Sequence, residues 1–146
     1  APAAASTYVW TLPAATDTLA AAGIDNVFTA VQTIPNVKSV QINKGNSGTS
    51  TQTYDVRNSQ QKVTVTGAHT WAFSNWPASG TRGEVEIEVV NGGAHVITFP
   101  TINWLVGDGT ASTAFADMDV TLAASGTNTV LVWSTDGGTT LRGRAG

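Results

Sequence analysis

The chain has 146 residues, a formal net charge of −3 and no cysteine. It is therefore long enough for one domain with its own core, and it excludes a disulfide framework and a thiolate metal site. Its seven Lys and Arg residues form no basic run, and no apolar run approaches the roughly 20 residues of a membrane span, so we expect neither a nucleic-acid nor a membrane partner.

Residues 1–36 are predicted to form an N-terminal arm. They contain no Lys or Arg and interleave Ala and Thr with prolines. Thr16 or Asp17 could cap a short helix that stops at Gly23, although such a helix is too short to stand alone. Because apolar side chains are costly to leave in water, we expect the arm to dock on its own domain or on a neighbour. The apolar cluster that would make this contact is Tyr8, Val9, Trp10 and Leu12.

From residue 37 onward, apolar and polar residues alternate with the period of half-buried strands. The spacing of these strands, about 8 to 12 residues, predicts an all-β domain over residues 37–146, an antiparallel β-sandwich or jelly roll. Strands are expected within 37–42, 51–56, 62–66, 69–73, 84–90, 94–99, 117–123, 127–134 and 139–144.

Two features of this domain are specific enough to check. In "EVEIEVV", Glu84, Glu86 and Glu88 should face solvent while the intervening Val85, Ile87 and Val89 face the core. The glycine-rich stretches at 91–93, 124–126 and 136–138 should be hairpin turns.

The order of turn motifs in the second half of the chain resembles a module of tailed-bacteriophage virion proteins, especially tail fibres and capsid-surface proteins. The matching stretches are "FSNWPASGTRGEVEIEVVNGG", "ITFPTINWLVGDG" and "VLVWSTDGGTTLRGRAG", which cover roughly half the chain. The family's usual W-x-G-G is loosened here to "WLVGDG". The resemblance implies a non-enzymatic virion component, commonly a homotrimer. The matching elements are Trp76-Pro77, Asn91-Gly92-Gly93, Phe99-Pro100 with Trp104, and Asp136-Gly137-Gly138.

Side chains that could carry chemistry are few, and we expect no enzyme, no metal and no cofactor. His69 and His95 both begin strand-like runs, where bonds to loop carbonyls are expected, although a threefold axis could gather one histidine into a trio. "STDGGTTL" at 134–141 resembles the structural Asp-box hairpin of sialidase-like propellers, but it occurs once. We interpret the carboxylates as solvent-exposed surface groups, with the Glu residues paired across strands to Arg57, Lys62 or Arg82.

The five tryptophans are the remaining candidates for a functional role. Trp71 and Trp133 lie on strand patterns and are predicted to be core residues. Trp76 and Trp104 lie at proline-marked corners, and we predict that they seal an end of the sandwich or contact another subunit, since tryptophan supplies large apolar area at an interface. A sugar-binding platform is the alternative role for these aromatics.

The function expected from these features is adhesion between macromolecules. The leading hypothesis is a capsid decoration (cement) protein, made in the host cytoplasm, that binds and stabilises the major capsid protein shell at the virion surface as a homotrimer. The alternatives are a tail-fibre or receptor-binding tip and a carbohydrate-binding module.

Overall fold

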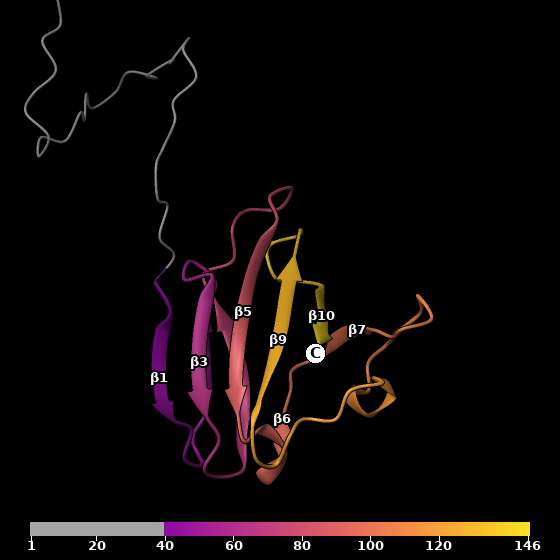
Figure 1. Ribbon diagram of the computed structural model, residues 1–146. Coiled ribbons are helices and arrows are strands. Elements are labelled where there is room, and N and C mark those ends of the chain that lie inside the picture. Colours follow the sequence, from indigo (N-terminus) through magenta and orange to yellow (C-terminus); the bar gives the residue numbers. More distant parts are fainter. Residues whose placement is uncertain (1–39) are drawn as a thin grey trace, which may run out of the picture. The chain divides into compact units, whose positions relative to one another are not determined.

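The alternating residues of the sequence form strands in two facing sheets over residues 40–146, the part of the chain that the computed structural model describes (Figure 1). The predicted arm, with Tyr8, Val9, Trp10 and Leu12, lies outside these described residues. The described strands are β1 (Ile42–Asn46), β2 (Gln52–Asp55), β3 (Gln60–Thr64), β4 (His69–Ser74), β5 (Gly83–Val90), β6 (Ile97–Thr98), β7 (Ile102–Leu105), β8 (Ala111–Ser112), β9 (Thr127–Ser134) and β10 (Leu141–Ala145). Two short 3-10 helices are η1 (Gly92–Ala94) and η2 (Phe115–Asp117).

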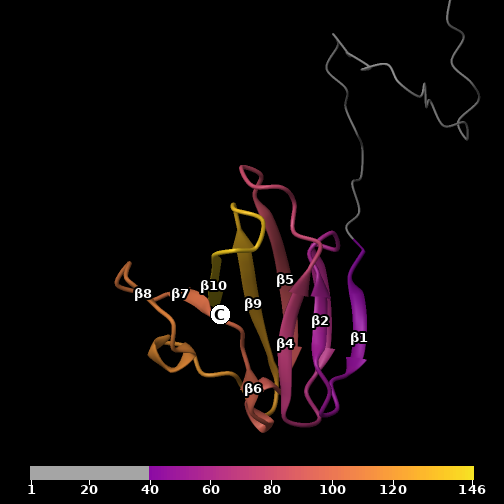
Figure 2. The same cartoon turned by 180° about the vertical axis from the view of Figure 1, so that it is seen from behind.

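The first seven strands alternate between the two sheets. A seven-stranded sheet has the order β1-β3-β5-β9-β10-β7-β8, and a three-stranded sheet has the order β2-β4-β6. Strands β1, β3 and β5 pair in parallel, as do β2, β4 and β6. The chain therefore winds from one sheet to the other, and Figure 2 shows the small sheet in front of the large one.

The later strands interrupt this winding. The β9–β10 hairpin inserts between β5 and β7, so that β5 pairs antiparallel with β9 while β10 pairs in parallel with β7. The hairpin predicted at 136–138 is thereby confirmed, and its strands occupy the centre of the large sheet (Figure 1).

The all-β prediction is confirmed, but antiparallel pairing is restricted to β5–β9, β9–β10 and β7–β8 among the described residues. Alternation predicts which face of a sheet a residue lies on, but it does not predict which strand pairs with which. Asn91 is an example: its left-handed backbone (φ 57) starts η1 and carries the chain across to β6 in the other sheet, so the predicted hairpin there was wrong.

Two strand predictions were also displaced. β1 begins at Ile42 and continues through residues predicted as a loop. Residues 117–123 form no strand, because η2 and an irregular segment replace it. Asp117 and Asp119 alternate there with Met118 and Val120, as polar and apolar residues do in a strand. This segment nevertheless pairs with no described strand.

The core lies between the two sheets and is centred on β5 and β9. Val85, Ile87 and Val89 have no exposed surface, whereas Glu84 and Glu86 are exposed, so the predicted faces of β5 are confirmed. Trp71 is 1% exposed, as expected for a core residue. Its neighbours in the aromatic part of the core are Tyr54 at a ring-centroid distance of 4.7 Å and Phe99 at 5.0 Å.

Tyr54 carries a hydroxyl that the core does not satisfy. The side chain is fully buried, and its Oη has no hydrogen-bond partner among residues 40–146. Burial also raises the pKa of Tyr54, because the phenolate would be desolvated. We expect Tyr54→Phe to raise the free energy of unfolding by about 1 kcal/mol. Chemical denaturation measures this, and an equal loss of stability would show that the hydroxyl has a partner in the folded protein.

Candidate interaction surfaces

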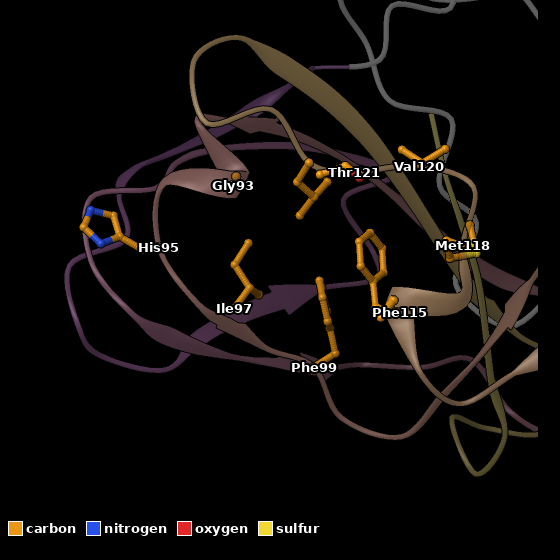
Figure 3. A pocket seen from close by; sticks show the side chains of 11 residues that line it. Gly93, His95, Ile97, Phe99, Phe115, Met118, Val120 and Thr121 are labelled. Atoms are coloured by element: carbon orange, nitrogen blue, oxygen red, sulfur yellow. The ribbon is translucent and has the colours of Figure 1, made fainter.

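An apolar groove of about 370 Å³ lies between η1, β6 and the segment that follows η2 (Figure 3). Ile97, Phe99 and Phe115 point into the same hollow. The apolar side chains of its lining are Ile97, Phe99, Phe115, Met118, Val120 and Leu122. The groove is thus an apolar surface built from two stretches of the chain, residues 92–99 and 115–122.

The walls of the groove are held by packing against the core. Phe99 and Phe115 stack at a centroid distance of 5.0 Å, and both rings contact Trp104, at 5.1 and 4.8 Å. On the opposite wall, the Gly93 N–H donates to Ala123 O at 3.0 Å. A Cβ at Gly93 would lie 2.1 Å from Leu122 O, so glycine is required for this approach. The groove is therefore preformed.

The groove lies beside the free edge of the three-stranded sheet. His69 N–H donates to Val96 O at 3.1 Å, which orients β6 so that the N–H and C=O of Ile97 point away from β4. Val96, at the start of this edge, is 71% exposed. An unpaired strand edge next to an apolar groove can accept an extended segment, which gains main-chain hydrogen bonds and buries its side chains.

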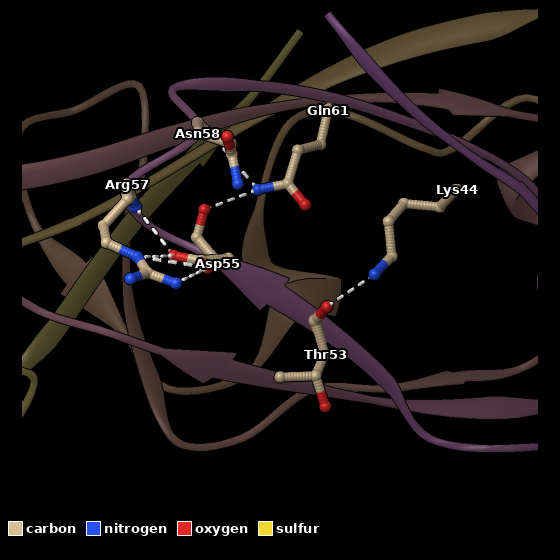
Figure 4. A network of polar contacts seen from close by, with 6 residues as sticks. All are labelled: Lys44, Thr53, Asp55, Arg57, Asn58 and Gln61. Carbon is tan, nitrogen blue, oxygen red and sulfur yellow. Dashed lines mark hydrogen bonds and ion pairs between the residues drawn. The ribbon is translucent and has the colours of Figure 1, made fainter.

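The opposite edge of the same sheet is occupied by side chains. Lys44 donates from Nζ to Thr53 O on β2 at 2.9 Å (Figure 4). Gln52 Nε2 donates to Ser47 O at 2.8 Å. Lys44 reaches this edge from β1 of the other sheet, and a lysine at a strand edge obstructs pairing with another chain. With respect to residues 40–146, the β6 edge is therefore the accessible one of the two edges of the small sheet.

The turn between β2 and β3 is fixed by a polar network (Figure 4). The buried Gln61 donates from Nε2 to Asp55 O at 2.8 Å and to Asn58 O at 3.0 Å. Arg57 forms an ion pair with Asp55 at 2.6 Å, and its hydrogen bonds hold the pKa of Asp55 well below its usual range. Arg57 was one of the predicted partners for a glutamate; it pairs instead within its own turn.

Trp76, predicted to seal an end of the sandwich or to contact another subunit, packs mainly on its own chain. Its ring centroid is 6.0 Å from that of Phe73, and a Cβ on Gly138 would lie 2.2 Å from Trp76 Cδ1. The neighbouring Pro77 covers Gly83 in the same way. The half-buried Trp76 also lines a hollow with Arg57 and Arg82, so only part of the ring is available to a partner.

The structure places Trp104 in the core and Trp133 on the outer face of the large sheet, the reverse of what was predicted for these two residues. Trp104 is 1% exposed and belongs to the core, so it cannot form the predicted intersubunit contact. Gly143 of β10 leaves room for it, since a Cβ there would lie 2.6 Å from Trp104 Cζ3. Trp133, predicted as core, is half-buried on the outer face of β9, where Arg82 Cζ lies 5.0 Å from its ring centroid.

The titratable side chains identified in the sequence either stabilise turns or lie apart from one another. His69 is buried and contacts Gly67 O through Nδ1 at 3.0 Å, the expected bond to a loop carbonyl, whereas His95 lies exposed at the groove. Bonds from Thr140 N–H and the Ser134 hydroxyl lower the pKa of Asp136 to about 2. Among residues 40–146 no three His, Asp or Glu side chains gather as metal ligands.

The groove was missed by sequence reasoning because the alternation of 117–123 suggested a strand. Phe115, three residues before Met118 and outside that alternation, was the available signal. In comparisons with known proteins, no family model, curated protein or solved structure matches the chain. None of the described helices has the length and apolar character needed to cross a membrane.

Proposed function

We propose that the protein is a non-enzymatic component of a tailed-phage virion, a capsid decoration protein that binds the major capsid protein shell as a homotrimer. The observation that carries the proposal is the preformed apolar groove beside the open β6 edge. Such a site suits an extended apolar segment of a shell subunit, which would add a strand to β6 and place side chains against Phe99 and Phe115.

The strength of such a contact fits a decoration protein. Burying one large apolar side chain of the partner contributes about 1.5–3 kcal/mol, and the ordering of both surfaces offsets part of this gain. A single contact is therefore weak. Repetition over a lattice, together with linkage of three protomers, makes the summed attachment strong.

The arrangement of the other residues supports adhesion over the alternatives. Asp55, Asp108 and Asp136 are engaged in turns, where neighbouring hydrogen bonds hold each pKa below its usual range. The burial of Trp71 and Trp104 removes two tryptophans from any sugar-binding platform. A tail-fibre tip remains the main alternative, since it would use the same groove on a receptor.

Shell binding tests the proposal through a matched pair of substitutions. Val120 lines the groove, whereas Val40 is 73% exposed beside β1. We expect the wild-type protein to co-sediment with expanded shells and raise their melting temperature. Val120→Glu should weaken binding at least about tenfold, because it places a charge in the apolar groove, and Val40→Glu should bind as the wild type does.

Two outcomes would contradict this proposal. The first is a wild-type protein that ignores shells, and adsorption to host cells in that case would favour the tail-fibre tip. The second is a folded Val120→Glu protein that binds shells with unchanged affinity. Circular dichroism of both variants shows whether the substitutions leave the β-fold intact. Removal of residues 1–36 asks separately whether the predicted arm, with Tyr8 and Trp10, contributes to binding.

A further inference from the structure

The outer face of the seven-stranded sheet concentrates the charge of the protein. All three glutamates of the sequence lie on it, together with four of the chain's seven Lys and Arg residues. The small sheet covers the other face, so this outer face is the one turned to the viewer in Figure 1. The charged residues are Lys62, Arg82, Glu84, Glu86, Glu88, Arg142 and Arg144.

The charges are arranged in rows that follow the strands. The register places Glu84, Trp133 and Arg142 side by side across β5, β9 and β10. One step along the strands, Glu86, Leu131 and Arg144 form an equivalent line. An acidic row and a basic row therefore flank a central apolar row of half-buried Leu131 and Trp133.

Part of this charge has no counterpart among residues 40–146. Lys62 pairs with Glu88 at 2.6 Å, and Arg82 pairs with Glu84 at 2.8 Å. Glu86, Arg142 and Arg144 form no ion pair with any residue of 40–146. Glu86 and Arg144 also border a shallow hollow whose largest apolar side chain is Leu131. The face therefore offers one unpaired acid and two unpaired bases on either side of an apolar centre.

We infer that this face binds a second copy of the chain, about a two-fold axis that runs along β9. Such an axis places the β5 side of one copy over the β10 side of the other, and it leaves the position of each residue along the strand direction unchanged. The acidic row of one copy then lies over the basic row of the other. Glu86 meets Arg144 of the second copy, Glu84 meets its Arg142, and the apolar rows meet at the centre.

Charge selects this axis over its alternative. A two-fold axis perpendicular to the strands would place the acidic row over the acidic row, and opposed like charges disfavour association. Six strand spacings of about 4.8 Å and strands about 20 Å long give a face of roughly 600 Å². That is close to the roughly 800 Å² that each partner buries in a standard interface.

This contact is separate from the proposed shell contact, because the groove lies at the β6 edge and the two-fold surface lies on the large sheet. A protomer that also joined a trimer would form a hexamer of two trimers. Without the threefold contact, the two-fold contact gives a dimer. In either case disruption of the face halves the mass of the complex.

Charge exchange tests the inference by sedimentation equilibrium of the purified full chain at low salt. Glu86→Arg places two arginines opposite each other, and Arg144→Glu places two glutamates opposite each other. Each single variant should weaken self-association at least about tenfold and halve the mass. The double variant, E86R with R144E, restores opposite charges at both positions and should restore the wild-type mass.

Asp119→Arg is the control, since Asp119 is exposed and lies off the large sheet; it changes net charge as Glu86→Arg does and should leave the mass unchanged. A wild-type monomer would overturn the inference, as would a trimer whose mass is insensitive to both single variants. A double variant that fails to reassociate would also overturn it. None of these results depends on shell binding, so the two-fold contact and shell binding fail separately, although a wild-type monomer would also contradict the proposed homotrimer.

Discussion

Gly138→Ala is expected to lower the free energy of unfolding by about 3 kcal/mol, whereas Gly137→Ala beside it costs about 1 kcal/mol. Both glycines have a positive φ, +74° at Gly137 and +86° at Gly138, so alanine strains the backbone at either position. Only at Gly138 does the new Cβ also meet a ring, 2.2 Å from Trp76 Cδ1, while the nearest atom to a Cβ on Gly137 is 3.8 Å away.

The difference between the two alanine variants measures the contact with Trp76. Urea denaturation of both proteins gives it directly. In a Trp76→Ala background the ring is absent, so Gly138→Ala should then cost no more than Gly137→Ala. Equal stabilities of the two single variants in the wild-type background would show that Trp76 moves aside without cost.

This contact shows that two motifs of the sequence form one joint. The Trp76-Pro77 corner precedes β5, and the Asp136-Gly137-Gly138 turn connects β9 and β10. Their sequence separation hides the contact, although each was identified from its own turn chemistry. Pro77 and Trp76 cover glycines of two different elements, Gly83 and Gly138, and so hold the β9–β10 hairpin against the start of β5.

Local pattern was sufficient to predict most strands and their faces. The alternation of β5 places Val85 inward and Glu84 outward because the side-chain period of a strand is two. The strand at His69–Ser74 and the hairpin after Ser134 follow from equally local signals. These features depend only on neighbours in the sequence.

Partners across sheets could not be predicted in the same way. Trp104 is buried because Phe99 and Phe115 pack on it and because Gly143, on a strand 39 positions later in the numbering, leaves room for its ring. Trp133 is displaced outward because Val132 and Ser134 face the core. Periodicity alone distinguishes neither case, since a period of two does not say which of the two faces of a strand is the inner one.

The groove was hidden for the same reason. Its apolar side chains come from β6, from η2 and from an irregular segment, and no single period connects them. Proximity arises only when the chain crosses to the small sheet after Asn91 and returns to the large sheet at β7. For a surface formed by such crossings between sheets, the sequence shows that apolar residues are present but does not show that they lie together.

The buried pair of His69 and Trp71 should be the other large contributor to stability. Trp71 Nε1–H donates to His69 Nε2 at 3.0 Å, and His69 Nδ1 contacts Gly67 O at 3.0 Å. The neutral ring with its proton on Nδ1 satisfies both contacts. His69→Leu leaves the indole N–H and the Gly67 carbonyl without this partner, and we expect a loss of about 3 kcal/mol.

His95→Leu is the matched control, because His95 is exposed and the same substitution there should change stability by less than about 0.5 kcal/mol. Trp71→Phe removes the indole donor, so adding His69→Leu to it should cost about 1–2 kcal/mol less than in the wild-type protein. Thermal and urea unfolding of the wild-type protein and the four variants provides these values. Equal costs of His69→Leu in the two backgrounds would mean that the indole N–H finds another partner, and the pair would then contribute through packing alone.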